Sequence, residues 1–550
     1  MKETAWLFHG GRILDARRAT AAERVVRSGA RERHAEAVLV RGELIEAVGP
    51  VDRLRRFAPR GVKVVNLRGG TLMPGFVDAH IHLLTWIRAM EDVWIQTQNQ
   101  EGLEQAVRAA EARAPDAEWI TLRGWIPRDW PRALKVQATL DRVRSERPLV
   151  LFAIDGHSAW GNSAALERAG IGPETPDPPG GRVDRDASGA LSGILIEEAA
   201  WLIRRGRRDP AAELTEAIRR AHLLGITGAC DFDRTDIWPA AQELAERDRL
   251  PFRLLLSIPA AKLDAAEELG IRSRWGSERL RVGPVKFFAD GTLGSGTALL
   301  EARYEDDTGT GMEVISPLEL EERCARAGKA GLTVAIHAIG DRAVRNALDA
   351  IEGSLKRGPF PIPPRIEHIQ LVREEDIPRF KALGVLASVQ PIHQVTDRAV
   401  ARRKWGARTA RSYAYRSLQR AGARLLFGSD APFDRAGPLL AIQAALLRRR
   451  GGEPESAAFH PEQRLGWAAC LRAHLEEPNR LAGWRTPLGR IQEGWGADLV
   501  RYDQDLLRTD PETLHQVAVR AVWVAGRLVT ANRSEIVDFG RMVVSLEAPR

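Results

Sequence analysis

Short apolar runs, many of them ending in a polar residue, recur along this chain of 550 residues. Helical patterns fill the gaps: in 212–224 the apolar side chains fall on one helix face before a stop at Gly225. Strands that alternate with helices predict parallel βαβ units, and eight such units predict an α/β fold of the (β/α)8 TIM-barrel type. The eight runs are 72–77, 226–230, 252–258, 285–289, 332–336, 365–367, 385–389 and 424–427.

The competing fold is a doubly wound sheet. Such a sheet would more often gather its chemistry at one or two loops, whereas here ligand-type residues end five of the eight runs. In a barrel, the C-terminal ends of all strands meet at one mouth, where the chemistry of this fold is placed. The pattern therefore favours the barrel.

Two regions do not fit a bare barrel, and the chain is too long for one compact core. Residues 90–212 separate the first run from its expected successor and carry strand-like runs at 118–123 and 148–154, which predicts an inserted α/β subdomain. Short β runs punctuated by glycine at both ends of the chain predict a small β-sandwich built from both termini. The predicted domains are 1–70 plus 485–550 (composite sandwich), 71–89 plus 213–484 (barrel) and 90–212 (insert).

The first run leads into His80 and His82, which point to the same face of a strand because they are two residues apart. Both imidazoles can therefore reach one ion. A lone HxH pair is weak evidence, since paired histidines also lie on surfaces or satisfy polar groups in a core. Asp78 has the same parity and could equally ligate an ion, support a ligand or cap a turn.

Lys286 stands in the strand run VGPVKFFADG, and it is unusual because only nine of the 81 basic residues are lysines. A surface-facing or salt-bridged lysine is the plain interpretation. An ammonium group has donors and no acceptor, so it cannot bind a cation. Burial would favour the neutral amine, which can take up carbon dioxide and become a carbamate whose two oxygens can bridge two metals.

His337, His368 and Asp430 each end a strand of their own. Any one of them could be a satisfied core residue. Ligand-type residues at five strand ends are a different matter, because imidazole and carboxylate groups suit Zn²⁺ and similar ions. The set therefore predicts a metal centre at the barrel mouth.

Segments spread over most of the chain resemble the amidohydrolase superfamily, specifically its amidohydrolase-3 branch, which includes N-substituted formamide deformylases. They include PGFVDAHIH, GWIPRDW, DGHSAWGNSAAL, VKFFADGTLGSG, HAIGDRAV, RIEHIQ, SVQPIHQVTD and GSDAPF. The resemblance implies two divalent ions, with zinc expected, bridged by the carbamate of Lys286. The implied metal ligands are His80, His82, Lys286, His337, His368 and Asp430. One departure is His474, where relatives tend to carry a threonine.

The implied activity is hydrolysis of a C–N bond, of an amide or formamide, by a metal-activated water. Asp430 is the expected catalytic residue, taking the proton from water and passing it to the departing amine. Ester, carbamate and cyclic amide substrates stay open. The substrate-binding candidates are Trp125, His157, Asn162, Gln390, His393 and Asp397.

Two other functions compete with this one. A mononuclear deaminase of the same superfamily would lack the bridging lysine and carry a glutamate soon after the histidine of the fifth strand. Here Lys286 is present and HAIGDRAV has no glutamate after His337. A non-catalytic barrel protein would be marked by lost ligands, and none of the six is missing.

A formal charge of +8 and a pI near 9.7 raise the question of nucleic-acid binding. The basic residues form no long tract; the clusters at 204–208 and 448–450 are expected to be solvated helix faces. Three widely spaced cysteines and the lack of a long apolar run predict a cytoplasmic protein without a secretory signal. The expected partners are a small amide-like substrate and, at most, a second copy of the chain in a homodimer, with no nucleic acid and no membrane.

Overall fold

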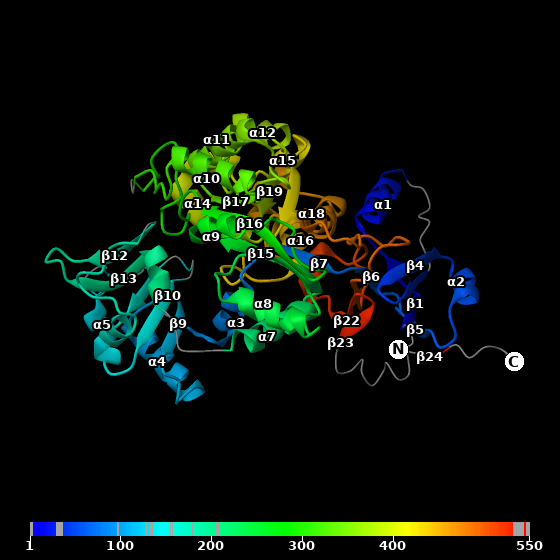
Figure 1. Ribbon diagram of the computed structural model, residues 1–550, viewed down its shortest axis with the longest axis horizontal. Helices are drawn as coiled ribbons and strands as arrows, with labels where there is room; N and C mark the ends of the chain where they lie inside the picture. Colours follow the sequence, from blue (N-terminus) through cyan, green and yellow to red (C-terminus); the bar gives the residue numbers. More distant parts are fainter. Residues whose placement is uncertain are drawn as a thin grey trace.

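The computed structural model describes residues 4–28, 37–95, 98–126, 130–131, 134, 136–153, 156, 158–178, 180–203, 209–306, 309–531 and 544–545. Three layers of structure follow one another across the molecule in Figure 1, with the sheet of the insert on the left, the barrel in the centre and two sheets from the chain termini on the right.

Eight parallel strands form a nearly closed barrel, each paired with the next along the chain. This confirms the predicted α/β barrel fold. The strands are β7 (Phe76–Ile81), β14 (Ile226–Asp231), β15 (Arg253–Pro259), β16 (Leu280–Phe288), β17 (Val334–Ala338), β18 (Arg365–His368), β19 (Leu386–Val389) and β20 (Arg424–Phe427).

The two end strands of this sheet, β7 and β20, meet through the loop that follows β20. The Asp430 amide donates to the His80 carbonyl at 2.7 Å, and the Ser429 amide donates to Oδ1 of Asp78 at 3.0 Å. Gly428 makes this approach possible, because a Cβ atom there would lie 2.5 Å from Cβ of His80. The first and last predicted ligand strands are therefore neighbours.

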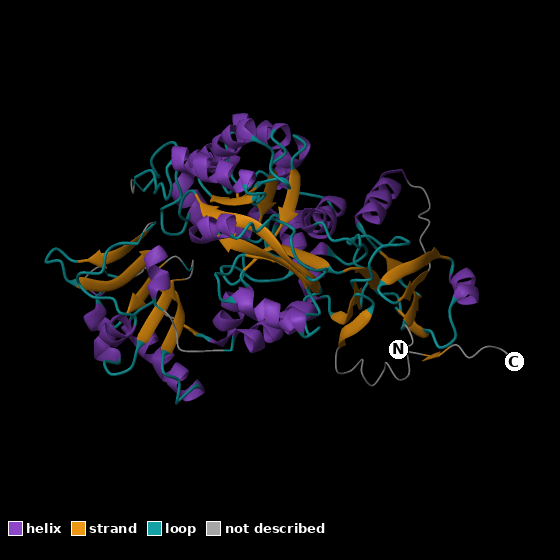
Figure 2. Cartoon of the chain, viewed as in Figure 1, coloured by secondary structure: helices purple, strands orange, loops and turns teal. Residues whose placement is uncertain are grey.

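Helices pack around the strands (Figure 2), and their apolar faces supply the outer core. In α7 (Pro210–Leu223) the predicted face is confirmed: Leu214, Ala217, Ile218 and Ala221 are buried, and Asp209 caps the helix. The other barrel helices are α3 (Leu83–Glu91), α8 (Ile237–Glu246), α9 (Leu263–Glu268), α10 (Pro317–Lys329), α11 (Asp341–Arg357), α12 (Ile377–Ala382), α13 (His393–Thr396), α14 (Arg398–Trp405), α15 (Tyr415–Arg420), α16 (Pro438–Leu447), α17 (Trp467–Leu471) and α18 (Glu477–Ala482), with α7 at Pro210–Leu223.

The first predicted run, 72–77, differs from the structure because it is divided at Gly75 between two sheets. β6 (Thr71–Pro74) pairs with a C-terminal strand outside the barrel, and only β7 belongs to the barrel. Gly75 fits tightly at the division, since a Cβ there would lie 2.1 Å from Oγ1 of Thr227. As a result, His80 lies within β7 rather than after it.

The insert contains a six-stranded mixed sheet in the order β12-β13-β11-β10-β9-β8. The runs predicted at 118–123 and 148–154 correspond to two of its inner strands, β9 (Ile120–Trp125) and β10 (Leu149–Ala153). The other elements are β8 (Val93–Trp94), α4 (Gln100–Arg113), α5 (Gln137–Val143), β11 (Ser158–Gly161), α6 (Ser163–Arg168), β12 (Gly181–Arg185) and β13 (Leu191–Glu197).

Two five-stranded sheets contain strands from both termini, in the orders β24-β5-β1-β3-β4 and β2-β6-β21-β22-β23. They share one apolar core, in which Trp523 packs edge-on against Trp6 and Phe8. Their strands are β1 (Ala5–His9), β2 (Arg12–Ile13), β3 (Ala37–Arg41), β4 (Leu44–Gly49), β5 (Lys63–Asn66), β21 (Leu499–Tyr502), β22 (Val519–Val524), β23 (Arg527–Ala531) and β24 (Val544–Ser545), with helices α1 (Ala16–Ser28) and α2 (Val51–Phe57). The domain boundaries given above stay a prediction.

The basic cluster at 448–450 is not the solvated face that its sequence suggested. Arg448 is fully buried and donates to the carbonyls of Phe459 and Tyr413, and Arg449 pairs with Glu512. The cluster at 204–208 lies outside the described residues. Within the described part of the chain, no helix combines the length and the apolar character needed to cross a membrane.

Candidate metal centre

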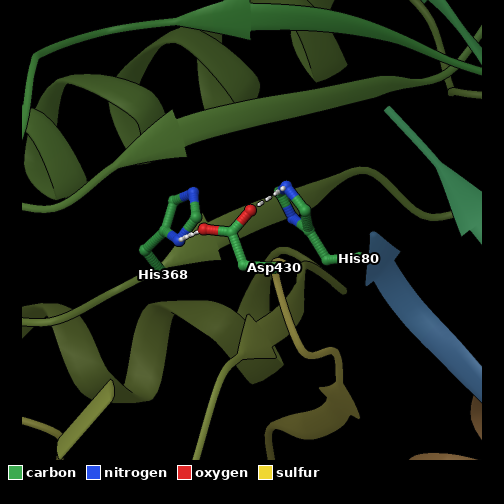
Figure 3. Close-up of side chains that lie close together, drawn as sticks. All are labelled: His80, His368 and Asp430. Atoms are coloured by element: carbon green, nitrogen blue, oxygen red, sulfur yellow. Dashed lines mark ion pairs between the residues drawn. The ribbon is translucent and has the colours of Figure 1, made fainter. Parts of the chain in front are cut away.

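Asp430 lies between two imidazoles at the mouth of the barrel (Figure 3). Its Oδ1 is 3.5 Å from Nε2 of His80, and its Oδ2 is 3.9 Å from Nδ1 of His368. All three residues are buried, and one ligand atom from each lies within 4.8 Å of the others. The end strand β7, strand β18 and the loop after β20 thus bring three predicted ligands together.

Two further histidines face the same carboxylate. Nε2 of His82 is 3.4 Å from Oδ1 of Asp430, and Nε2 of His393 is 3.9 Å from Oδ2. Burial alone would raise the pKa of Asp430, but the surrounding imidazoles, one of which (His82) donates a hydrogen bond, outweigh burial and hold it well below its usual value. Asp430 is therefore ionised at neutral pH.

The backbone is strained where these side chains are presented. His368, Ile369 and Asp430 have φ angles of 75°, 48° and 57°, in the left-handed region that residues with a Cβ seldom adopt. Each such residue costs on the order of 1–3 kcal/mol, which the surrounding structure must offset. The strain lies where β18 and β20 present two of the predicted ligands, His368 and Asp430.

A buried carboxylate that the sequence reasoning missed fixes His80 from behind. Oε2 of Glu367 is 2.7 Å from Nδ1 of His80, and Arg365 donates to both Glu367 oxygens. Burial alone would raise the pKa of Glu367, but Arg365 and His80 hold it well below its usual range, so it is an acceptor only. The sequence did contain an indication of this pair: Arg365 and Glu367 are two residues apart in a short strand, so their opposite charges lie on the same face.

This arrangement leaves two acceptors facing each other. Burial and the charge of Lys286 lower the pKa of His80 to about 4, so the ring is neutral at neutral pH. Its one proton is on Nδ1, toward Glu367, and Nε2 therefore directs a lone pair at the ionised Asp430. A cation between the two groups would satisfy both, so the donor set fits a metal ion.

The hydrogen bonds of the other two predicted histidines indicate which ring nitrogen of each carries no proton. Nε2 of His337 lies 3.0 Å from the Gly291 carbonyl and donates to it, which makes Nδ1 the unprotonated nitrogen. Nδ1 of His368 lies 3.0 Å from Oε1 of Gln390, which can only accept, so Nε2 is unprotonated there. The rings of His337 and His368 are 4.4 Å apart. His337 thus joins the predicted set.

Lys286 is buried, and among the described residues its ammonium nitrogen has no hydrogen-bond partner. It lies 4.9 Å from the ring centres of both Phe232 and Phe288. Burial lowers the pKa of Lys286 to about 8, which places a fraction of it in the neutral form near pH 7. An unpartnered amine on β16 is the state that the predicted carbamate would require.

Acidic residues near the ligands have structural partners. Asp78 accepts from the His80 and Ser429 amides, and burial raises its pKa to about 6. Asp231 and Asp233 of the DFD segment accept from the first amides of α3, directly after His82. They cap that helix and so hold the second histidine of the pair in place.

The predicted substrate-binding residues fall into two groups. Gln390, His393 and Asp397 follow β19; His393 faces Asp430, and Gln390 is bonded to His368. Trp125 is buried in the insert against Trp160, and Asn162 caps α6. His157 lies outside the described residues. A direct role in substrate binding stays a prediction for all six.

The insert nevertheless reaches the site through Gly156. A Cβ there would lie 1.9 Å from the ring of Phe433, three residues after Asp430, and Gly156 has a φ of 72°. The same ring packs edge-on against His82 at 5.3 Å. Gly156 therefore lies against one side of the mouth.

Comparison with known proteins gives a consistent result. Residues 63–530 match the profile described as the amidohydrolase family. The chain is 30% identical over 513 residues to YtcJ of Bacillus subtilis (strain 168), named as an amidohydrolase, covering 90% of this chain and 96% of that protein. It is 27% identical over 532 residues to the N-substituted formamide deformylase of Arthrobacter pascens, covering 91% and 95%. Among solved structures, an uncharacterised metal-dependent hydrolase from Pyrococcus horikoshii OT3 superposes with a TM-score of 0.75 at 25% identity, covering 92% and 99%.

Proposed function

The chain belongs to the amidohydrolase family, and from that premise we propose that this metal-dependent hydrolase cleaves the C–N bond of a small amide or formamide. The observation that carries the proposal is the pair of acceptors, Nε2 of His80 and Oδ1 of Asp430, that face each other at 3.5 Å. The likeness to an N-substituted formamide deformylase supports the substrate class.

We propose that His80, His82, Lys286, His337, His368 and Asp430 hold two divalent ions. Imidazole and carboxylate donors favour Zn²⁺ among the common divalent ions. When bound, such ions lower the pKa of water and polarise a carbonyl group. The chain's own residues supply orientation: Glu367 holds His80 and Gln390 holds His368, each through Nδ1.

Lys286 would complete this set as a carbamate. Its neutral nitrogen attacks the carbon of carbon dioxide, one C–O π bond becomes a lone pair on oxygen, and the nitrogen gives up one proton to solvent water. The product carries a negative charge and two oxygens. The nitrogen is then no longer a buried amine that lacks a hydrogen-bond acceptor, a state that costs free energy.

Asp430 is the proposed proton carrier. It is ionised, buried and surrounded by imidazoles, so it can take a proton from the attacking water and deliver it to the amine nitrogen as the C–N bond breaks. Because its pKa is held low, the protonated state is short-lived and delivery to the more basic amine is favoured.

The test is metal content per chain, together with hydrolysis of N-formyl and N-acyl amines, in protein supplied with bicarbonate. Lys286→Met keeps the side chain's length but cannot form a carbamate. Lys404→Met is the matched control, because Lys404 is also a buried lysine over an aromatic ring, paired with Asp306 away from the site.

We expect about two ions in the wild type and in Lys404→Met, and about one or fewer in Lys286→Met with hydrolysis lost. One ion or fewer in the wild type, unchanged by Lys286→Met, would remove the carbamate bridge and favour a mononuclear enzyme. No hydrolysis of any amide by metal-loaded wild type would reject the proposed reaction.

A further inference from the structure

A chain of polar side chains leads away from Asp430 and contains none of the other proposed metal ligands. His393 faces Asp430, and Nε2 of Gln370 lies 3.3 Å from Nδ1 of His393. The same Gln370 nitrogen lies 3.4 Å from Oδ2 of Asp397, to which the Tyr413 hydroxyl donates at 3.1 Å. Gln370 and His393 are buried.

The carboxylate of Asp397 determines which way the Gln370 amide faces. If the amide were turned over, its oxygen would face the carboxylate oxygen, and two acceptors would meet without a proton between them. Burial, with Asp397 nearby, raises the pKa of Tyr413 well above its usual value, so the hydroxyl stays a donor to Asp397. In the orientation found, the Gln370 oxygen has no partner among the described residues, which costs less free energy than placing two acceptors against each other.

The orientation of Gln370 in turn determines the tautomer of His393. An amide nitrogen has two protons and can donate to both Asp397 and His393. Nδ1 of His393 must then accept, so the ring proton is on Nε2, the nitrogen that faces Asp430. At 3.9 Å the Asp430 oxygen is too distant to accept a normal hydrogen bond from it.

We propose that His393 donates a hydrogen bond from Nε2 to the carbonyl oxygen of the substrate, and that Gln370 is the positioning residue that keeps this donor in place. The inference rests on the proposed function, because a carbonyl that is attacked beside Asp430 gains negative charge on its oxygen. A fixed N–H donor stabilises that charge in the transition state more than in the substrate. The site is thereby matched to carbonyl compounds, such as amides, rather than to aromatic rings attacked at carbon.

Two substitutions at Gln370 separate this role from packing. Gln370→Met removes the donor and leaves His393 free to take either tautomer. Gln370→Glu presents an acceptor and draws the His393 proton to Nδ1. Gln394→Met is the matched control. Gln394 directly follows His393 in the chain, is buried like Gln370, and donates to the Ala444 carbonyl instead of to His393.

The experiment combines ¹⁵N spectra of the metal-loaded, ¹⁵N-histidine-labelled enzyme with steady-state kinetics, and His393→Gln identifies the His393 signals. We expect a protonated Nε2 in wild type and Gln394→Met, and a protonated Nδ1 in Gln370→Glu. We expect kcat to fall about 100-fold in Gln370→Glu and about tenfold in Gln370→Met, with KM and metal content within about twofold.

A wild-type His393 protonated on Nδ1 would overturn the inference, as would an unchanged kcat in both Gln370 variants. The ring spectra need no turnover, so they decide the tautomer even if no amide is hydrolysed and the proposed function fails. Equal losses in Gln394→Met and Gln370→Met would reduce Gln370 to a packing residue and would also overturn the inference.

Discussion

The barrel mouth and the insert both hold residues that the sequence marked as candidates for substrate binding, but their surroundings differ. In the insert, Asn162 accepts from the Leu149 and Ala165 amides and donates to two carbonyls, and Trp125 packs in an apolar cluster. At the mouth, four histidines converge on the single carboxylate of Asp430.

This difference shows that the site is identified by several side chains that face one carboxylate, rather than by a buried polar atom without a partner. Among the described residues, the indole nitrogen of Trp125 has no partner, just as Lys286 has none. Lys286 is close enough to the carboxylates of Glu367 and Asp430 to interact with their charges, whereas the indole is surrounded by aliphatic and aromatic side chains. We therefore expect substitutions at the mouth to affect turnover and those in the insert to affect stability.

The largest effect is expected for Asp430→Asn. The amide cannot carry the proton and is a weaker ligand, so kcat for amide hydrolysis should fall roughly 10⁴-fold. The variant should still fold, because the substitution keeps the side chain's shape, with some loss of unfolding free energy because the folded structure favours the anion of Asp430. Kinetics on metal-loaded protein check this, with thermal unfolding as the control; turnover near the wild-type value with metal bound would refute the role of Asp430.

Trp125→Ala should produce the converse result. Removing a fully buried indole that packs at a tilt against Trp160, with ring centres 5.4 Å apart, leaves a cavity in the insert. The expected loss of unfolding free energy is about 3–5 kcal/mol, with kcat unchanged below the melting temperature. Denaturant unfolding measures the loss. A large rise in KM with little loss of stability would instead place Trp125 in the substrate pocket.

Asn162→Ala should give a smaller loss of about 1–3 kcal/mol, because it leaves the Leu149 amide and two carbonyls without their side-chain partner. Asn162→Ser is the matched variant, since a hydroxyl can still accept from the Ala165 amide and cap α6. Its loss should be smaller than that of alanine. Equal losses would mean that capping contributes little.

The sequence predicted the barrel well because the predicted metal ligands lie in or directly after its strands. Placing His80, His337, His368 and Asp430 together, each near the C-terminal end of its strand, needed only the rule that parallel strands share one mouth. The division at Gly75 was not predictable, because an apolar run does not say which sheet it joins. The pairing of β6 with β21 depends on a segment more than 400 residues away along the chain.

The network behind the ligands was less accessible from sequence. Arg365 and Glu367 could have been paired from their spacing in a strand. Gln370 reaches His393 only because His368 and Ile369 adopt left-handed backbone angles, which redirect the chain after β18. No propensity predicts two consecutive residues of that kind, since a histidine and a β-branched residue both disfavour the conformation.

His474 provides the most demanding test of the comparison, with the smallest expected effect. Its Nδ1 donates to the Val77 carbonyl at 3.3 Å, and its ring packs edge-on against Phe76 and Phe427. Its Nε2 has no partner in the described part of the chain. Judged by unpaired atoms alone it would belong to the site, but it does not converge on Asp430, so we expect a structural role.

Burial lowers the pKa of His474 to about 4, below its ordinary value near 6.5, so the unfolded chain binds the proton more tightly. Stability should therefore fall as pH decreases from 6.5 toward 4, by about 1 kcal/mol between pH 7 and 5.5 for this residue. His474→Gln removes that contribution, and the difference between the two unfolding curves isolates it from the other buried histidines. Because Asp430 and its imidazoles are untouched, the variant should keep the wild-type kcat. A pH dependence identical to the wild type would mean that His474 is not kept neutral by burial. A lost kcat would mean that the functional site extends through β7 to His474.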